Sequence, residues 1–482
     1  MVVRRFISLV LGILIPYLAC LVESRAVGRP NIVFILADDV RWDDLGCTGH
    51  PFSQTPHLDR LAREGMLFRQ AFATTPLCSP SRASFLTGLY PHQHGITDNT
   101  DRSPTSHRLA TFPQHFKQHG YETAFIGKWH MGNDDSRRPG FDHWVCLKGQ
   151  GSSWDPELNV NGSPEKTSGH VTDVLAEQAL AFLKRPHPQP FLLYLAHKAV
   201  HPETVQLADG SLSDPQASNF VPAERHAQLY EGQTVPRRPN AQAPRGKPIL
   251  QRPLPGLPPL GPETGSSDEA ILGRLRMLAG IDDSVGLLLD ALRATGVLDD
   301  TVVVFTSDHG YFYGEHGLSV ERRFAYEEAI RIPLWVRYPP RVPPGSTCEQ
   351  MVLSIDLAPT LGDLAGLPAQ PGLHGRSFVP LFSEPNRQFR DAFLIEHYSD
   401  QVFPRAAGCG YQAVRTPSWK WIHYVDVVGM DELYHLEQDP LEMRNLIADP
   451  QAQEALARIR DEWRRLLGET QAPARPSLPA SN

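Results

Sequence analysis

The sequence predicts an α/β fold with a mostly parallel central sheet flanked by helices, followed by a small C-terminal α+β subdomain. Three continuous apolar runs, at residues 31–37, 191–196 and 301–305, have the composition of strands buried on both faces of a parallel sheet. Helical periodicity lies between them, at residues 58–64 and in a longer stretch at 268–295. Strands that alternate with helices in this way are typical of an α/β sheet.

The last part of the chain has a different pattern. Short strand-like runs at residues 413–415 and 419–424 precede a charged helical pattern at 451–467. Residues 470–482 are polar and rich in proline, as in a frayed tail. We therefore expect three parts after the N-terminal segment: a main domain over residues 27–390, a C-terminal subdomain over 391–469 and a tail over 470–482.

Residues 203–264 interrupt the main domain. They hold 11 of the 44 prolines and show little apolar periodicity. This composition predicts an irregular excursion of the main domain, not a second core.

The overall composition is that of a globular protein. Hydrophobic residues make up 41% of the 482 residues and charged residues 21%, which excludes a wholly disordered, collagen-like or coiled-coil chain. The formal net charge of -8 provides no basic field for nucleic acid. No segment after the N-terminus is long and apolar enough for a stable membrane span.

The N-terminus has the features of a signal peptide. Arg4 and Arg5 precede an apolar run at residues 6–22, and small residues follow up to Ala26. We expect residues 1–26 to be a signal peptide, removed after Ala26, and the mature protein to be periplasmic or secreted.

Two alternatives at the N-terminus remain open. A membrane anchor is disfavoured because the run is short for a span and Pro16 interrupts it. A lipid attachment site at Cys20 is disfavoured because Tyr17 is a poor residue in such a site.

The mature chain would carry an odd number of cysteines. If an oxidising compartment pairs the others, one cysteine is left over. The five are Cys47, Cys78, Cys146, Cys348 and Cys409.

Polar, metal-binding side chains follow the three apolar runs. The first run ends at Asp38 and Asp39, the second at His197, and the third leads to Asp308 and His309. In open α/β sheets ligands bind at the carboxyl ends of the strands. Polar residues at the start of a solvated loop would explain any one of these sets, but the three sets together favour a ligand site.

Several ordered motifs together identify a family. Cys78-Ser79-Pro80-Ser81-Arg82 leads to Leu86-Thr87-Gly88, and Gly120-Tyr121-Glu122-Thr123 precedes Gly127-Lys128-Trp129-His130. The chain resembles the type I, formylglycine-dependent sulfatases of the alkaline phosphatase-like superfamily from about residue 30 to 466. Within that family it looks like a bacterial-type exported carbohydrate sulfatase. Further matching motifs are Ser307-Asp308-His309-Gly310, Tyr326-Glu327-Glu328, Arg331-Ile332-Pro333 and Leu433-Tyr434.

The resemblance implies the nucleophile. A separate formylglycine-generating enzyme would convert Cys78 to an aldehyde, whose hydrate attacks the sulfur of a sulfate ester and later expels sulfate. Arg82 would hold this hydrate with fixed, charged donors. The alternative for Cys78 alone is a buried apolar thiol, which the neighbouring motif residues disfavour.

The resemblance also implies a metal site. Asp38, Asp39, Asp308 and His309, with an oxygen of residue 78, would bind one Ca²⁺ ion per chain, or Mg²⁺ or Mn²⁺ in its place. Clustered carboxylates repel each other, and a cation holds them ionised together. His309 is unusual, because calcium prefers oxygen ligands.

Basic residues complete the implied site. Lys128 would bind sulfate, and His130 would act as a base; two residues apart on an extended strand end, they would point the same way. His201 fits an acid for the leaving alcohol or another sulfate contact. His197 is expected to be structural.

One motif departs from the family pattern. Relatives carry a sulfate-binding lysine shortly after Gly314-Glu315-His316-Gly317-Leu318, but residues 319–323 contain no lysine. Arg322 is the best replacement, because arginine also binds an oxyanion, and bidentately. Arg323 is the alternative.

The predicted function is a sulfuric ester hydrolase that releases sulfate from a sulfated sugar. Segments 149–151 and 159–162 are similar to relatives that act on amino-sugar 6-sulfates, which favours that substrate. The alternatives are a phosphoric or phosphonic ester hydrolase of the same superfamily and a non-catalytic glycan-binding protein. Intact nucleophile and metal positions argue against the latter.

Overall fold

The computed structural model describes residues 28–474, except 208, 210, 215–218, 399 and 401. Several sequence predictions fall outside the described residues. They are the signal peptide, its two alternatives (a membrane anchor and a lipid attachment site at Cys20) and residues 475–482 of the tail. Among those described, no helix combines the length and the apolar character needed to cross a lipid bilayer.

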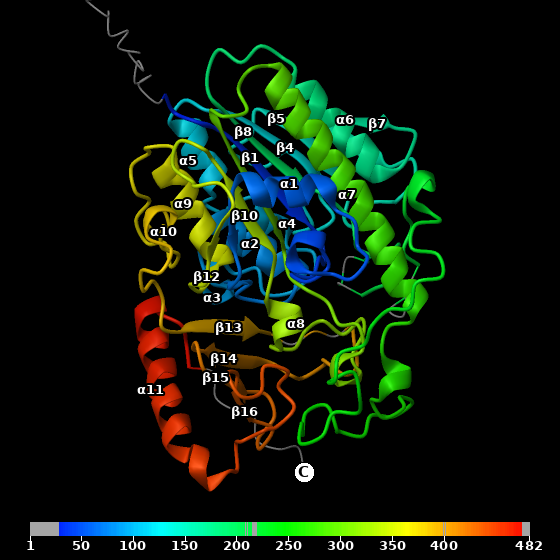
Figure 1. Ribbon diagram of the computed structural model, residues 1–482, viewed down its shortest axis with the longest axis vertical. Coiled ribbons are helices and arrows are strands. Elements are labelled where there is room, and N and C mark those ends of the chain that lie inside the picture. The colour runs from blue at the N-terminus through cyan, green and yellow to red at the C-terminus, as the bar shows by residue number, and fades with distance from the viewer. Residues whose placement is uncertain are drawn as a thin grey trace, which may run out of the picture.

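A large sheet forms the centre of the molecule (Figure 1). Five neighbouring strands, β9, β1, β8, β4 and β5, run parallel, and antiparallel pairings extend the sheet on both sides. This arrangement confirms the expected α/β fold class. In spatial order the described strands are β11 (Ser346–Cys348), β2 (Met66–Phe68), β10 (Leu334–Arg337), β9 (Thr301–Ser307), β1 (Asn31–Ala37), β8 (Phe191–Ala196), β4 (Glu122–Lys128), β5 (His143–Leu147), β6 (Glu157–Val160) and β7 (Ser163–Lys166).

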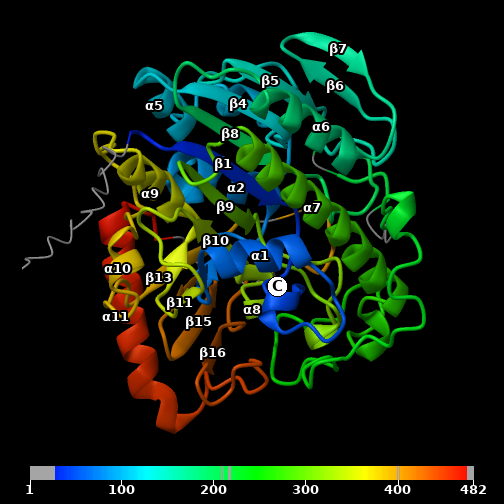
Figure 2. The same cartoon turned by 45° about the horizontal axis from the view of Figure 1, so that its top comes forward.

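Helices cover both faces of this sheet, because successive side chains of a buried strand point to opposite sides. In β1, Val33 and Ile35 pack in one core, whereas Ile32 and Phe34 pack in the other. Figure 2 shows the long helix α7 lying across one face. The first core holds α1 (Pro56–Glu64), α6 (Val171–Leu183) and α7 (Asp268–Ala294), and the second holds α2 (Cys78–Thr87), α5 (Phe112–Gln118), α9 (Leu357–Leu364) and α10 (Pro380–Ser383).

The C-terminal part forms a separate antiparallel sheet with one long helix against it (Figure 1). The strand-like runs predicted at 413–415 and 419–424 lie in β14 and β15, and the charged helix begins at Gln453 and ends at Thr470. The elements are β13 (Phe393–His397), β14 (Tyr411–Arg415), β15 (Trp419–Tyr424), β16 (Glu432–His435) and α11 (Gln453–Thr470).

The proline-rich excursion contains little regular structure. Its described residues form two short 3₁₀ helices, η2 (Glu224–His226) and η3 (Pro262–Thr264). The other short elements are η1 (Gly46–Thr48), β3 (Ala71–Phe72), α3 (Pro91–His94), α4 (Ser103–Ser106), η4 (Glu315–Gly317), α8 (Glu327–Ile330), β12 (Val352–Leu353), η5 (Ser354–Asp356) and η6 (Pro450–Ala452).

Candidate active site

Two adjacent parallel strands bring four of the expected metal-binding residues together. Ala37 of β1 pairs with Ser307 of β9, so the residues that follow each strand lie side by side. The backbone N–H of Asp39 donates to Asp308 Oδ1 at 3.0 Å, and Asp39 Oδ1 lies 3.3 Å from His309 Nδ1. All of these side chains are fully buried.

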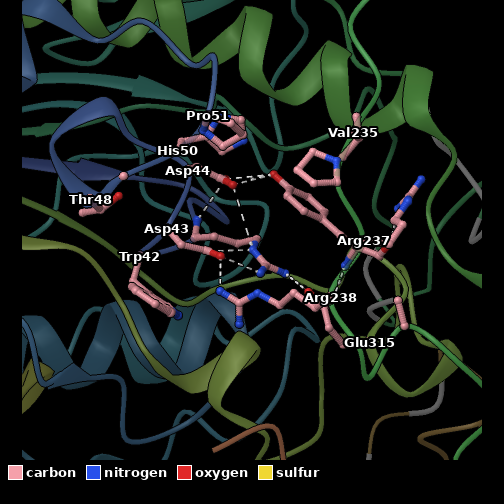
Figure 3. Close-up of a pocket in the computed structure, with 15 residues that line it drawn as sticks. Trp42, Asp43, Asp44, Thr48, His50, Pro51, Val235, Arg237, Arg238 and Glu315 are labelled. Carbon is pink, nitrogen blue, oxygen red and sulfur yellow. Dashed lines mark hydrogen bonds and ion pairs between the residues drawn. The ribbon is translucent and has the colours of Figure 1, made fainter.

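A hollow lined in part by residues that follow β1 does not contain this cluster. It encloses about 280 Å³ and is lined by residues 41–44, 48–51, 235–238, 241, 313 and 315 (Figure 3). Its charged side chains already pair with one another: Arg41 donates to Asp43 and to Glu315, and Arg238 contacts Asp43. This hollow therefore offers no free charge for a ligand and no nucleophile.

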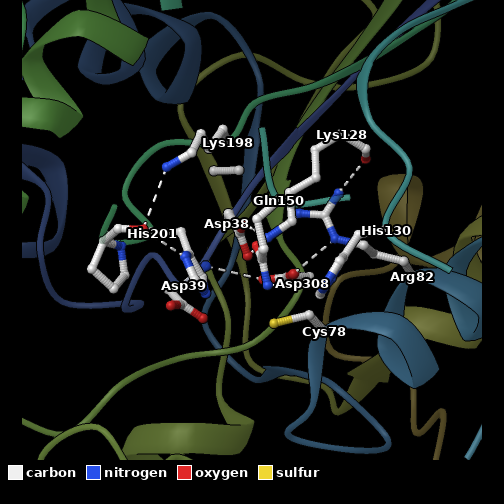
Figure 4. Close-up of polar contacts among 12 residues, drawn as sticks. Asp38, Asp39, Cys78, Arg82, Lys128, His130, Gln150, Lys198, His201 and Asp308 are labelled. Carbon is white, nitrogen blue, oxygen red and sulfur yellow. Dashed lines mark hydrogen bonds and ion pairs between the residues drawn. The ribbon is translucent and has the colours of Figure 1, made fainter. Parts of the chain in front are cut away.

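Cys78 lies at the first position of α2 and faces the strand ends (Figure 4). Its Sγ is 3.3 Å from His309 Nε2. Ser81, one turn further along α2, donates to the Asp308 carbonyl oxygen at 2.5 Å and so docks the helix on β9. Ligand atoms of Cys78, Asp38 and Asp308 lie within 4.8 Å of one another.

A close backbone contact explains the glycine after His309. A Cβ atom at Gly310 would lie 2.0 Å from the carbonyl oxygen of Glu328, in α8. Only glycine leaves room for this contact, which holds Asp308 and His309 in place.

Burial and neighbouring charges shift the pKa values of the carboxylates in opposite directions. Burial and the neighbouring Asp38 raise the pKa of Asp308 to about 8. Lys128 and Arg82 overcome burial and hold the pKa of Asp38 well below its usual range. Asp38 Oδ1 and Asp39 Oδ2 are buried without a hydrogen-bond partner in the described structure.

These observations fit a divalent cation. Two carboxylates with an unpartnered oxygen, those of Asp38 and Asp39, match the hard-oxygen donors that calcium and magnesium prefer. His309 Nε2 faces Cys78 Sγ, whereas Nδ1 lies 2.9 Å from the Gly310 carbonyl oxygen and 3.3 Å from Asp39 Oδ1. Burial opposes protonation of His309, but Asp308 and Cys78 raise its pKa to about 9. A bound cation would favour the neutral ring instead.

Each carboxylate has one basic neighbour. Lys128 Nζ contacts Asp38 Oδ2, and Arg82 Nε donates to Asp308 Oδ2 at 3.1 Å. Arg322 Nε donates to Asp39 Oδ1 at 2.8 Å. All three basic side chains are buried, so they form fixed donors around the cluster.

The structure distinguishes Arg322 from its neighbour. Arg323 points away from the aspartates: its Nε donates to Asp400 Oδ2 at 2.5 Å, and its guanidinium lies over the ring of Phe403. Of the two sequence alternatives, Arg322 is therefore the one that reaches the Cys78 cluster.

His130 lies in the same cluster, but its backbone conformation differs from the expected one. β4 ends at Lys128, and His130 adopts a φ of 56°, so the expectation of an extended strand end was wrong there. The ring Nε2 lies 2.9 Å from Gln150 Nε2 and contacts Gln206, while Nδ1 is buried without a hydrogen-bond partner among the described residues. Burial and Lys128 hold the pKa of His130 well below its usual range.

His201 and His197 have different surroundings. His201 Nδ1 lies 2.9 Å from the Pro202 carbonyl oxygen, and burial and Lys128 lower its pKa well below the usual range. His197 Nε2 is 3.3 Å from Ser284 Oγ on α7, and burial lowers its pKa to about 4. His197 thus packs against the helix layer, away from Cys78.

A pocket continues from His201 and Arg322 towards the C-terminal subdomain. Gln150, Thr204 and Gln206 form one side of it, and Arg323, Val402 and Phe403 form the other. Residues from both parts of the chain therefore line this small cavity, which encloses about 20 Å³.

Sequence reasoning missed Gln150 and Lys198. Gln150 contacts His130, and the buried Lys198 lies between the end of β8 and His201 (Figure 4). The signal for Lys198 was available, because a lysine directly after a buried strand must find a partner or lose its charge.

A family model described as Sulfatase matches residues 30–367, and one described as N-sulphoglucosamine sulphohydrolase, C-terminal, matches residues 314–469. An N-acetylglucosamine-6-O-sulfatase of Bacteroides thetaiotaomicron is 30% identical, over 93% of this chain and 87% of the relative. The N-acetylglucosamine-6-sulfatase of Homo sapiens is 29% identical, over 87% of this chain and 81% of the relative.

Solved structures share the fold. A protein crystallised in complex with its substrate D-glucosamine-2-N,6-O-disulfate superposes with a TM-score of 0.80 at 28% identity, over 93% of this chain and 99% of that chain. A phosphonate monoester hydrolase of Agrobacterium radiobacter superposes with a TM-score of 0.71 at 22% identity, over 92% of this chain and 96% of that chain, which is a likeness of fold alone.

Proposed function

The chain belongs to the sulfatase family and hydrolyses sulfate esters, and from this premise we propose that its substrate is an amino sugar carrying a 6-O-sulfate. The support is that relatives named for N-acetylglucosamine-6-sulfate, and one bound to a glucosamine disulfate, match most of this chain. Within the site, the observation that carries the proposal is Cys78 close to three carboxylates, two of which keep an oxygen without a hydrogen-bond partner in the described structure.

We propose that a formylglycine-generating enzyme converts Cys78 to formylglycine after export of the chain to the periplasm or the medium. The motif around Cys78 and the signal-peptide pattern at residues 1–26 support this maturation. As a hydrated aldehyde, residue 78 supplies the oxygen nucleophile and a second hydroxyl that allows sulfate to leave. The family is metal-dependent in general, and we propose Ca²⁺ as the ion here.

Asp38, Asp39, Asp308 and His309 would hold that ion. It would supply positive charge that keeps the carboxylates ionised and stabilises the transferring sulfuryl group. Mg²⁺ or Mn²⁺ would be held by the same donors.

Side chains of this protein orient residue 78 and bind the sulfate group. Arg82, which donates to Asp308 and to the Lys128 carbonyl oxygen, orients residue 78. Lys128 and Arg322 bind sulfate oxygens with charged donors that are already fixed in place. Because each contacts an aspartate as well, their positions are set before the substrate arrives.

Two histidines move protons. His130 is neutral at neutral pH, and its unpartnered Nδ1 accepts a proton from the hydroxyl of residue 78. His201 serves the leaving alcohol. The negative charge of a bound sulfate ester favours protonation of His201, and the contact of Nδ1 with Pro202 leaves Nε2 to deliver the proton.

The decisive experiment is a screen of defined sulfated saccharides with chromatographic detection of released sulfate. We expect the highest kcat/KM on N-acetylglucosamine 6-sulfate and lower values on 2-O- and 4-O-sulfated sugars. Faster turnover of 4-nitrophenyl phosphate or a phosphonate ester than of 4-nitrophenyl sulfate would replace the proposal with the phosphoric or phosphonic ester hydrolase.

Maturation has its own test. Mass spectrometry of the peptide around Cys78, after expression with a formylglycine-generating enzyme, should show the aldehyde. An unmodified thiol in fully active protein would contradict the mechanism, and Cys78→Ala should fold and be inactive.

A further inference from the structure

Lys198 is a buried charged group beside the active site that the proposed reaction does not use. It follows β8 by two residues, and its side chain is fully buried. Its Nζ lies 3.3 Å from Glu203 Oε2, 3.4 Å from Ser153 Oγ and 3.4 Å from the Pro202 carbonyl oxygen. A buried ammonium with three oxygen partners holds those partners in one arrangement.

One of the three partners is shared with His201. The Pro202 carbonyl oxygen lies 2.9 Å from His201 Nδ1 and also accepts from Lys198 Nζ. The backbone N–H of His201 donates to the Lys198 carbonyl oxygen at 3.0 Å, which closes the turn between them. Movement of the Pro202 carbonyl group would therefore change the orientation of the His201 ring.

The other two partners join a second loop to this turn. Glu203 Oε2 accepts from the Ser153 N–H at 3.0 Å and also from the Ser153 hydroxyl group. Ser153 belongs to the loop that carries Gln150, whose side chain contacts His130. Lys198, Glu203 and Ser153 thus connect the segments that carry both histidines.

We infer that Lys198 is a positioning residue, which acts through the Pro202 carbonyl group and Glu203 to hold the His201 ring towards the leaving alcohol. This inference rests on the proposed function, because it assigns Lys198 a role only through the step that His201 performs. Lys198 itself need not touch the substrate.

A double-mutant cycle tests the inference. Lys198→Met keeps the length and apolar stem of the side chain and removes its charged donors. We expect kcat on N-acetylglucosamine 6-sulfate to fall about tenfold with little change in KM. In a His201→Ala background the same substitution should lower kcat by less than about twofold, because residues that act as one unit are not additive.

The controls separate positioning from general damage. Lys148→Met removes an exposed lysine near the same loop and should leave kcat unchanged. Glu203→Gln keeps an acceptor but removes its charge, and it should lower kcat about threefold with the same dependence on His201. If Lys198→Met does not fold, the cycle is measured with Glu203→Gln instead.

Equal losses from Lys198→Met in both backgrounds would overturn the inference, since they would mean that Lys198 binds sulfate directly or only supports the fold. If the wild-type enzyme does not hydrolyse the 6-sulfate, the proposed substrate is wrong. The cycle is then measured on 4-nitrophenyl sulfate, so that the two failures remain distinct.

Discussion

Two pairs of neighbouring aspartates follow β1, and the contacts of their side chains differ. Asp38 and Asp39 lie at the end of the strand, and Asp43 and Asp44 lie four residues further along. Both pairs are buried or nearly so, and both have an arginine close by. The difference between them lies in how many of their carboxylate oxygens accept a hydrogen bond from the chain itself.

Every carboxylate oxygen of the second pair has a hydrogen-bond partner in its surroundings (Figure 3). Arg41 donates from Nε and Nη2 to the two oxygens of Asp43, at 2.9 and 3.0 Å. The Tyr313 hydroxyl group lies 2.8 and 2.9 Å from the two oxygens of Asp44. These contacts use the carboxylates as structural partners and leave no reason for a ligand.

Each carboxylate of the first pair keeps one oxygen without a hydrogen-bond partner in the described structure, although basic side chains contact both Asp38 and Asp39. Burial and the Asp38 charge raise the pKa of the adjacent Asp308 to about 8. Cys78 lies within reach of the same group. Burial of charge alone therefore does not mark a site; unpartnered carboxylate oxygens beside a nucleophile do.

The largest expected effect is on the first pair. Asp38→Asn should lower kcat/KM on the sulfated sugar by about a thousandfold, because it removes the charge of a proposed metal ligand and the partner of Lys128. Chelation should lower the melting temperature of the wild-type protein, and calcium should restore it, whereas the variant should show a smaller shift. Wild-type rates in a preparation free of metal by elemental analysis would remove the metal from the mechanism.

The basic residues around the first pair come next. Lys128→Ala and Arg322→Ala should each lower kcat/KM by about a hundredfold, the scale of losing one electrostatic stabiliser. Arg323→Ala is the matched control and should change kcat/KM by less than about threefold, since Arg323 pairs with Asp400. Steady-state kinetics of the three variants give the ranking, and a larger loss for Arg323 than for Arg322 would reverse our assignment.

Substitutions in the second pair should change the free energy of unfolding more than kcat/KM. Asp43→Asn breaks the paired contact with Arg41, and we expect the free energy of unfolding to fall by about 2 kcal/mol, less than for a fully buried pair because Asp43 is partly exposed. Denaturant titration measures this change. A loss of kcat/KM beyond about threefold in the folded variant would mean that the two aspartate pairs are coupled.

The smallest expected effect is a dependence of stability on pH. Burial and the Asp43 charge raise the pKa of Asp44 to about 6, above its value in the unfolded chain. A raised folded-state pKa contributes stability below the unfolded-state pKa of about 4, and this contribution is lost as the pH rises through about 6.

Asp44→Asn cannot titrate, so its stability relative to the wild type should improve from pH 4 to pH 7, on the order of 1 kcal/mol. Melting temperatures of both proteins across this range, at matched ionic strength, provide the comparison. Parallel curves would show that Asp44 does not titrate differently in the folded state.

Local patterns predicted much of the fold. The apolar run at 31–37 is strand β1 from end to end, and the periodic stretch at 268–295 is helix α7, one residue shorter. The short strands at the edges of the main sheet, such as β2 and β11, had no such signal, because three residues carry too little periodicity and their partners are distant in the chain.

Local patterns also predicted part of the site, but not the conformations of its loops. The motif around Cys78 named its residues, but counting along the loop could not separate Arg322 from Arg323. His130 was placed on an extended strand end, whereas its backbone turns at a positive φ. Loop conformations depend on packing against other segments, which a local pattern does not contain.

By itself, the sequence determined the fold class, the sulfatase motifs and the set of residues available for chemistry, because strand and helix periodicity and motif spacing are local properties. Only the tertiary structure decided which aspartates keep an unpartnered oxygen, which arginine reaches them, and that Lys198 joins the turn of His201 to the loop of Gln150. The physical reason is that hydrogen bonding and charge compensation depend on distant partners: Asp39 contacts Asp308, 269 residues further along the chain.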